Sequence, residues 1–436
     1  MPKAYSGITP ETAALTLPRS PLIRAQLMVW LLLAGAQILH AQVTAVRAGT
    51  LIDPATGTAS RGQVILVEGT RITAVGAGLA IPAGARVIDL SGSTVLPGLF
   101  DAHTHLCMSV NLRRDAGSYY YTTLNDPDSY RAIQGVANAR SMLRAGFTTV
   151  RDVGNEGGFA CASLRRAVAQ GLVEGPTIIN AGRIIAPFGG QFQLQPDKGA
   201  VLATPEYFFA DTRDELLKAV RENIHYGATV IKLVVDDQDY IYTPEDIRFV
   251  VEEAGKAGLR VAAHAWTGPG AHNAVRGGVA SLEHLNGVSD ETLALARTNG
   301  IVAVFTPFPQ WVLEAFRPKE RAVEEYRAEI DRLRAAHRIG VTIAFGTDAI
   351  HDMPGHTRGS QAITWIESYL EAGLPPKAIL QAMTVNAARL LGVERERGAI
   401  KPGLAADIIA LPGNPLEDPR LLREVNFVMK DGTVVR

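Results

Sequence analysis

The central part of the chain alternates short β-branched runs with longer segments in which apolar residues recur every three or four positions. The short runs predict buried strands, and the longer segments predict amphipathic helices. The predicted strands lie at 94–101, 148–152, 177–180, 229–234, 259–264, 280–284, 301–305 and 341–346. The predicted helices lie at 128–145, 164–170, 213–226, 244–257, 290–299, 318–338 and 359–372. Strands that alternate with helices in this way predict an α/β fold, here a (β/α)8 TIM barrel.

Both ends of the chain show a different pattern. Short alternating runs separated by turn residues fill 43–95 and return between 406 and 435, which predicts small antiparallel strands. Neither piece has enough strands for a core of its own. We therefore expect 42–95 and 396–436 to form one small composite β-sandwich domain, with the barrel at 96–395 between them.

The first 41 residues have the order of a secretion signal. Basic residues within 1–26 precede an apolar run at 27–39, which is too short to span a bilayer comfortably. We expect a signal peptide at 1–41, cut after Ala41, and a mature protein that is periplasmic or secreted and has no membrane partner. A start at Met28 would remove the basic residues, so a cytoplasmic protein stays open as the alternative.

Length, charge and cysteine content narrow the classes of partner. A chain of 436 residues exceeds the usual size of a single core, in agreement with one large and one small domain. The net charge of −1 gives no electrostatic reason to expect nucleic acid or an anionic membrane, so a small molecule is the expected partner. Cys107 and Cys161 are the only cysteines, which excludes a disulfide framework and a cysteine-based zinc site.

Candidate metal ligands follow the predicted strands. His103 and His105 stand two positions apart, so an extended backbone places both imidazoles on one face, where they suit a borderline metal such as zinc. The other candidates are Lys232 in the fourth strand, His264 and His284 at the ends of the fifth and sixth, and Asp348 after the eighth. The C-terminal ends of barrel strands converge on one face, so these side chains are expected to meet there.

In this order, five segments resemble the metal-dependent amidohydrolase superfamily: DAHTH at 101–105, VIKL at 230–233, AAHA at 262–265, LEH at 282–284 and FGTDA at 345–349. The tail from AARLLG onward is similar to the family's return into its β-sandwich. The resemblance implies a site for two divalent metal ions, with Zn²⁺ the first candidate.

The resemblance also assigns a role to each ligand. His103, His105 and Asp348 would hold the more buried ion, and His264 and His284 would hold the second. Lys232 would bridge the two ions as a carbamate derived from carbon dioxide. Burial among apolar neighbours lowers a lysine pKa, and the neutral amine can then add carbon dioxide. The alternative is a buried Lys232 paired with one of the aspartates near it in the sequence.

The two-metal pattern is similar to the branch that contains Xaa-Pro dipeptidases, carboxypeptidases of N-acyl amino acids and ochratoxin-degrading amidohydrolases. It implies hydrolysis of an amide or peptide bond in a dipeptide or N-acyl amino acid, with ochratoxin A among the candidate substrates. A metal-bound hydroxide would attack while Asp348 takes its proton. Relatives often form homo-oligomers, and we expect one here.

Two other functions stay open. One is a mononuclear cyclic-amide hydrolase or deaminase similar to imidazolonepropionase, against which Lys232 argues, since such relatives generally lack the bridging lysine. The other is a non-catalytic scaffold similar to dihydropyrimidinase-like proteins, which lose ligands that are all present here. The metal content per chain would separate the binuclear from the mononuclear reading.

Several polar residues are expected around the mouth of the site. Tyr119, Arg113 and Arg114 follow the first strand and could offer aromatic surface and charge for a carboxylate, although a solvated loop explains the arginines equally well. His351 lies on the loop after Asp348, where it could contact substrate or serve only as a loop residue. The acidic run at 236–239 either repels anions or faces water.

Overall fold

The structure is a computed structural model that describes residues 42–436, except 155–156, 194, 196–198, 200 and 202–204. The predicted signal peptide at 1–41 lies outside the described residues. Among the residues that the structure describes, no helix is both long enough and apolar enough to cross a bilayer.

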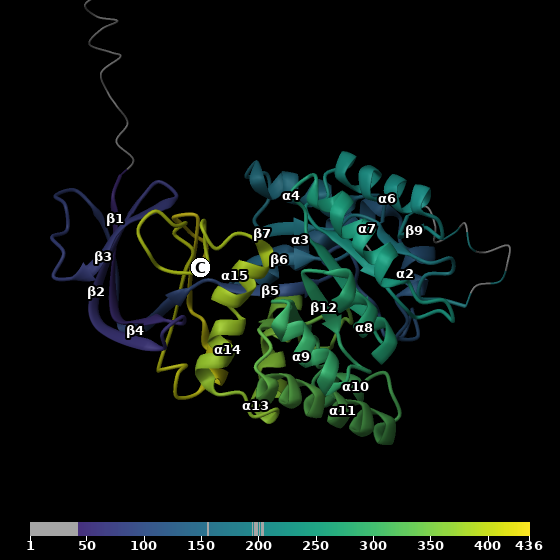
Figure 1. The fold of residues 1–436 in the computed structure, drawn as a ribbon. Coiled ribbons are helices and arrows are strands. Elements are labelled where there is room, and N and C mark those ends of the chain that lie inside the picture. Colours follow the sequence, from purple (N-terminus) through teal and green to yellow (C-terminus); the bar gives the residue numbers. More distant parts are fainter. Residues whose placement is uncertain (1–41, 155–156, 194, 196–198, 200, 202–204) are drawn as a thin grey trace, which may run out of the picture. The chain divides into compact units, whose positions relative to one another are not determined.

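The first and last strands of the described chain build one seven-stranded sheet in the order β17-β16-β15-β4-β1-β2-β3. Its strands are β1 (Thr44–Asp53), β2 (Thr58–Glu68), β3 (Arg71–Ala77), β4 (Arg86–Pro97), β15 (Ile408–Leu411), β16 (Phe427–Lys430) and β17 (Thr433–Val434). The two ends join where β15 runs antiparallel to β4, with Ala410 opposite Val95. Figure 1 shows the purple N-terminal strands beside the yellow C-terminal segments. The expected terminal β domain is confirmed, with an apolar core of its own that includes Val46, Ile65 and Met429.

The central strands form two parallel sheets. They are β5 (Leu99–Thr104), β6 (Phe147–Asp152), β7 (Thr177–Asn180), β8 (Ile184–Ala186), β9 (Tyr207–Phe209), β10 (Ile231–Val234), β11 (Val261–Ala265), β12 (Ser281–His284), β13 (Val302–Phe305) and β14 (Ile343–Phe345). One sheet has the order β5-β6-β7 and the other β14-β13-β12-β11-β10-β8-β9. A few backbone hydrogen bonds link the sheets on both sides, among them those from Thr229 N to Asn180 O (2.8 Å) and from Asp348 N to His103 O (2.8 Å). The arrangement agrees with a (β/α)8 barrel, although no continuous ladder closes the ring among the described strands.

The helices connect these strands (Figure 1). They are α2 (Tyr120–Asn125), α3 (Asp128–Arg144), α4 (Ala160–Ala169), α6 (Arg213–His225), α7 (Pro244–Gly255), α8 (Gly268–Gly277), α9 (Asp290–Thr298), α10 (Gln310–Leu313), α11 (Lys319–Ile339), α12 (Arg358–Ala362), η1 (Ile363–Trp365), α13 (Ile366–Glu371), α14 (Pro376–Ala382), α15 (Val385–Leu391) and η2 (Pro419–Glu424). The single helix predicted at 359–372 is divided into α12, η1 and α13. Helix α8 was not predicted, because two glycines and a proline in its first turn hide the apolar spacing.

The structure also corrects the first predicted barrel strand, which ends one sheet and begins another. Residues 94–97 belong to β4 and pair with β15, and β5 begins only at Leu99. Gly98 separates them at a point of close approach, where a Cβ atom would lie 2.1 Å from Thr148 Oγ1. The continuous apolar run concealed this change of sheet, because the end of β4 (94–97) and the whole of β5 are both buried.

Candidate metal centre

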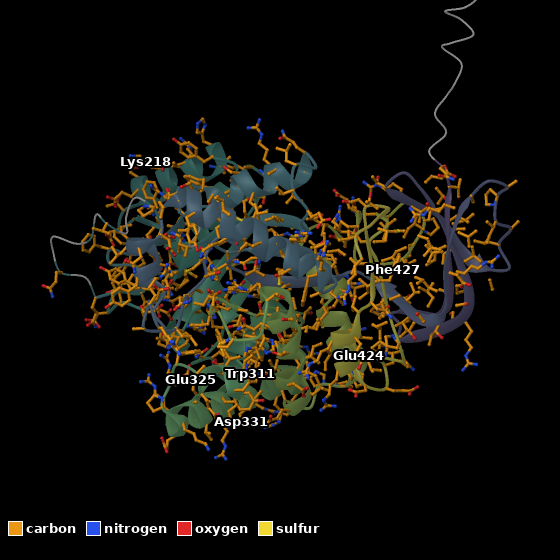
Figure 2. All side chains as sticks on the ribbon, turned by 180° about the vertical axis from the view of Figure 1, so that it is seen from behind. Lys218, Trp311, Glu325, Asp331, Glu424 and Phe427 are labelled. Atoms are coloured by element: carbon orange, nitrogen blue, oxygen red, sulfur yellow. The ribbon has the colours of Figure 1, made fainter. Side chains whose placement is uncertain are left out.

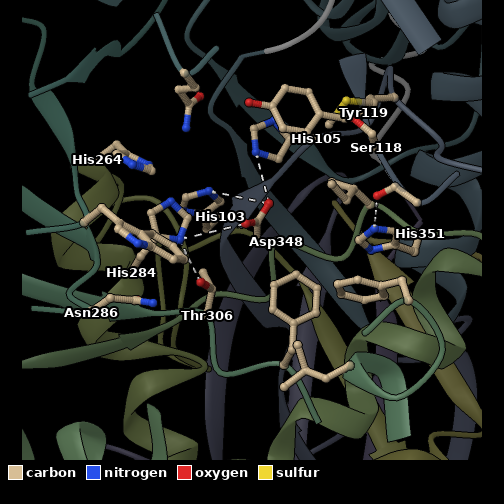
Figure 3. Close-up of a pocket in the computed structure, with 18 of the residues that line it drawn as sticks. His103, His105, Ser118, Tyr119, His264, His284, Asn286, Thr306, Asp348 and His351 are labelled. Atoms are coloured by element: carbon tan, nitrogen blue, oxygen red, sulfur yellow. Dashed lines mark hydrogen bonds and ion pairs between the residues drawn. The ribbon is translucent and has the colours of Figure 1, made fainter. Parts of the chain in front are cut away.

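All six predicted ligands line one cavity of about 330 Å³. The six are His103, His105, Lys232, His264, His284 and Asp348, and Figure 3 shows the histidines around Asp348. They come from the strands β5, β10, β11 and β12, or from the residues that directly follow β5 and β14. The parallel strands therefore bring together side chains that lie up to 245 positions apart in the sequence, from His103 to Asp348.

Asp348 lies at the centre of the imidazole cluster. Its Oδ1 is 3.2 Å from His105 Nε2 and 3.9 Å from His103 Nε2, and its Oδ2 is 3.8 Å from His284 Nδ1. The ring centroid of His284 lies 4.7 Å from that of His103 and 4.6 Å from that of His264. Carboxylate oxygens and imidazole nitrogens at these distances form the mixed donor set that zinc accepts.

Hydrogen bonds at the far side of two rings orient them toward the cavity. His103 Nδ1 lies 2.8 Å from Glu283 Oε2, and His105 Nδ1 lies 2.7 Å from the carbonyl oxygen of Gly154. Both acceptors favour the tautomer with hydrogen on Nδ1, which leaves a lone pair on Nε2. His103 Nε2 is buried and has no hydrogen-bond partner among the described residues. A buried nitrogen without a partner fits the role of a metal ligand.

Glu283 is one of the residues of this site that the sequence pattern did not single out. Its side chain is fully buried and also forms an ion pair with Arg151 NH2 at 2.7 Å. Arg151 donates from Nε to the carbonyl oxygen of Ala102, one residue before His103. The pair therefore holds both the side chain and the backbone of this ligand. The available signal was the position of Glu283 beside His284 in the LEH segment.

Lys232 is buried in β10 between Ile231 and Leu233. Burial lowers its pKa to about 8, although the Glu283 carboxylate opposes this shift. No hydrogen bond or ion pair joins its Nζ to any side chain of the described residues. The alternative of a lysine paired with a nearby aspartate is therefore not observed. An amine that is partly neutral and unpaired fits the chemistry of carbamate formation.

The acidic run after β10 faces water only in part: Asp236 is buried, Asp237 is half-buried and Asp239 is exposed. Asp236 is fully buried and accepts hydrogen bonds from the backbone nitrogens of Trp266 and Thr267. Asp237 Oδ2 lies 2.8 Å from His264 Nε2. These two aspartates form with His264 a group whose ligand atoms lie within 4.8 Å of one another. The alternation of side chains between the two faces of β10 continues past the end of the strand, so Asp236 points to the same side as Lys232 and Val234.

A second group with the same spacing contains His103, His284 and Asp348. These two groups place His284 with His103 and Asp348, whereas the family resemblance assigned His284 to the same ion as His264. His284 lies beside both, because its ring is 4.6 Å from that of His264. It also contacts Thr306, with 2.9 Å between Nδ1 and Oγ1.

Two ligands adopt the left-handed backbone region. The φ angle is 67° at His284 and 53° at Asp348. Burial alone would raise the pKa of Asp348, but the hydrogen bond to His105 and the nearby imidazoles outweigh it and lower this pKa to about 2. Burial also keeps the pKa values of His103 and His284 well below their usual range. The site therefore offers an ionised carboxylate at Asp348 and neutral imidazoles at His103 and His284, which are the protonation states of metal ligands. At His105, burial alone would lower the pKa, but the hydrogen bond and the charge of Asp348 outweigh it and raise this pKa.

The rim residues divide into those that reach the cavity and those that do not. Tyr119 and His351 line it, and His351 Nε2 lies 3.2 Å from the carbonyl oxygen of Gly117, to which it can donate. Arg114 does not line it, because its guanidinium is held by Asp115 and Asp126. The cavity wall instead contains three charged residues that the sequence did not single out: Arg317, Glu325 and Glu329.

Three comparisons with known proteins agree with this architecture. The amidohydrolase family model matches residues 94–436. The ochratoxinase of Aspergillus niger is 28% identical to the chain, covering 98% of this chain and 92% of that protein. A crystal structure of a Xaa-Pro dipeptidase with bound methionine in the active site superimposes with a TM-score of 0.79 at 30% identity, covering 90% of this chain and 99% of that one. An imidazolonepropionase of Cutibacterium acnes is 25% identical, covering 87% of this chain and 94% of that protein.

The family model covers all six candidate ligands that meet in the cavity: His103, His105, Lys232, His264, His284 and Asp348. A scaffold without catalysis is disfavoured, because no ligand position is lost. From its sequence, its fold and the contents of this cavity, the chain belongs to the amidohydrolase family and is a hydrolase of amide C–N bonds.

Proposed function

We propose that this protein is a binuclear metal-dependent amidohydrolase that cleaves dipeptides or N-acyl amino acids and releases the C-terminal residue. The observation that carries the proposal is Lys232, which is buried in the same cavity as the four predicted histidine ligands and Asp348 and has no hydrogen-bond or ion-pair partner among the described residues. A lone ammonium in that place would repel a cation, whereas a carbamate would supply two oxygen ligands. The similarity to a Xaa-Pro dipeptidase and to an ochratoxinase supports the class of substrate.

Two divalent ions, when bound, would polarise the scissile carbonyl group and make a water molecule acidic at neutral pH. The chain itself supplies the proton transfer. Asp348 is ionised and lies among His103, His105 and His284, so its carboxylate can accept a proton from the attacking water. The water oxygen bonds to the carbonyl carbon, the C–N bond breaks, and Asp348 returns the proton to the leaving nitrogen.

The remaining parts of the proposal rest on donor chemistry and on the sequence. Zn²⁺ is the first candidate, because imidazole and carboxylate donors surround the cavity. The order of residues in 1–41 supports export to the periplasm or the medium. The family resemblance supports a homo-oligomer. The substrate is a small molecule, since the cavity of about 330 Å³ is in the range of small-ligand sites.

A second candidate is a mononuclear cyclic-amide hydrolase. It is favoured by the similarity to the imidazolonepropionase and by the compact group of His103, His284 and Asp348, which could hold one ion without Lys232. The two candidates differ in the metal content per chain and in their dependence on the lysine.

The deciding experiment measures metal content and turnover in the wild type and in Lys232→Met. Zinc-supplemented protein is expected to contain about two ions per chain and to hydrolyse members of a panel of dipeptides and N-acyl amino acids. Lys232→Met is expected to retain one ion or fewer and to lose activity. Lys218→Met is the matched control, because Lys218 is exposed on α6, as Figure 2 shows. One ion per chain in both proteins, together with hydrolysis of cyclic amides only, would establish the second candidate instead.

A further inference from the structure

One wall of the cavity carries acidic groups that the proposed chemistry does not use. Glu325 and Glu329 both line the cavity and lie four positions apart on α11, so they share one face of the helix. Figure 2 labels Glu325 on this helix. Neither residue belongs to the groups that could hold a metal ion. Their place in the cavity therefore needs another explanation.

The two carboxyl groups differ in their partners. Glu325 Oε2 lies 3.4 Å from Arg317 Nε, so its charge is compensated. Glu329 accepts a hydrogen bond from the backbone of Phe308, but its Oε2 is buried and has no hydrogen-bond partner among the described residues. The charge of Arg332, three positions further along the helix, opposes the rise in the pKa of Glu329, but the two side chains form no ion pair within 4.0 Å among the described residues. Glu329 Oε2 is therefore the buried acceptor of this wall that has no hydrogen-bond partner there.

The neighbouring residues define the shape of the subsite. Phe308, Leu313 and Phe316 line the cavity around the two glutamates and offer apolar contact. The Arg317 guanidinium lies over the Phe316 ring at 5.0 Å, and this ring in turn stacks on His351 at 4.1 Å between centroids. Apolar side chains and a carboxyl oxygen without a partner in the same cavity fit a ligand side chain with an alkyl stem and a cationic head.

We propose that this wall selects substrates with a cationic side chain, and that the Glu329 carboxyl group binds their ammonium or guanidinium group. The inference rests on the proposed amide hydrolysis and names the chemistry of one substrate side chain. Burial and the nearby Glu325 raise the pKa of Glu329 well above its usual range, because both disfavour the charged carboxylate. A cationic head beside it would favour the carboxylate and pair with it, whereas an uncharged or acidic head would leave it unpaired.

The test uses dipeptides that differ only in the charge of one side chain. Norleucine matches the alkyl stem of lysine without the ammonium group, so Ala-Lys is compared with Ala-norleucine, and Lys-Ala with norleucine-Ala. We expect kcat/KM in the wild type to favour lysine by about tenfold or more at one of the two positions. Glu329→Gln is expected to reduce that ratio to near one, and Glu325→Gln to reduce it in part. Glu324→Gln, on the exposed face of α11, is the control and is expected to keep the ratio.

A second measurement separates this inference from the proposed function. Calorimetric titration with lysine amide and norleucine amide reports binding without turnover, so it applies even if no dipeptide is cleaved. Tighter binding of lysine amide that is lost in Glu329→Gln would support the subsite alone. A lysine-to-norleucine ratio near one at both positions in the wild type, an unchanged ratio in Glu329→Gln, or a preference for Ala-Glu or Glu-Ala would overturn it. Hydrolysis of the norleucine dipeptides in those cases would leave the proposed function standing.

Discussion

The role of Glu283 can be tested by removing its charge while keeping its shape. Glu283 lies 2.8 Å from His103 Nδ1 and 2.7 Å from Arg151 NH2, and it also accepts a hydrogen bond from Ser281. In Glu283→Gln, a single carbonyl oxygen would replace two carboxylate oxygens. The amide NH2 group must then face either the His103 imidazole or the Arg151 guanidinium. One ligand loses its orientation, or one buried cation loses its partner.

The expected cost follows from the burial of this pair. The side chain of Arg151 is 2% exposed and that of Glu283 is 0% exposed, so the guanidinium charge cannot be screened by water. Loss of one partner from such a pair destabilises a protein by about 3–5 kcal/mol. Loss of the hydrogen bond behind a ligating histidine lowers metal affinity by about 10–100-fold. We therefore expect both losses in Glu283→Gln.

Two assays separate these effects. Denaturant unfolding of the chelator-treated protein gives the free energy of unfolding, and competition with a chelator gives the zinc affinity. Glu174→Gln is the control: Glu174 pairs with Arg140 at 2.9 Å, but its side chain is 47% exposed, so its loss should cost less than about 1 kcal/mol. Our account of Glu283 would be refuted if Glu283→Gln kept both the stability and the zinc affinity of the wild type.

Three further predictions concern the metal, the proton-transfer residue Asp348, and Gly98 between β4 and β5. Chelator treatment is expected to abolish turnover and lower the melting temperature, with both restored by zinc, because bound metal stabilises only the folded state; unchanged activity without metal would contradict the site. Asp348→Asn is expected to lower kcat by about 10²-fold or more with a smaller change in KM, and steady-state kinetics on the best dipeptide would show it. Gly98→Ala is expected to lower the free energy of unfolding by about 1–3 kcal/mol or more, since its Cβ atom would lie 2.1 Å from Thr148 Oγ1. Gly92→Ala, where no atom lies within 4 Å, is the control for urea denaturation and should change it by less than about 0.5 kcal/mol.

The fold was predictable where the hydrophobic pattern is long and regular. The β-branched runs located the barrel strands, and the glycine at the end of α11, Gly340, has the left-handed backbone (φ 85°) of a helix stop. The strands β8 and β9 were not predicted, because three residues are too few to show a period. The break at Gly98 was missed for the opposite reason, since the apolar run continues through it.

The gathering of the candidate ligands in one cavity was predictable, because their residue types are rarely buried without a reason. His103 and Lys232 stand out in apolar strands, whereas the residues that support them do not. Arg114 and Arg317 illustrate the limit. Both are loop arginines in the sequence, but Arg114 is held by Asp115 and Asp126, and Arg317 lines the cavity. Which arginine reaches the cavity depends on side-chain pairs that the hydrophobic pattern does not show, such as that between Arg114 and Asp126 at the end of α2.

Two of the predicted ligands, His284 and Asp348, have a strained backbone conformation. Positive φ angles occur at His284, Leu285 and Asp348, and each such residue costs about 1–3 kcal/mol unless the surroundings enforce it. Histidine and aspartate tolerate this region better than most residues. The backbone hydrogen bond from Asp348 N to His103 O holds one of these conformations, and Leu285 N bonds to Glu283 O beside the other two. Backbone contacts of the barrel therefore help to orient both predicted ligands. Because these contacts are independent of the ligand atoms, chelation is expected to weaken the site while the barrel keeps its fold.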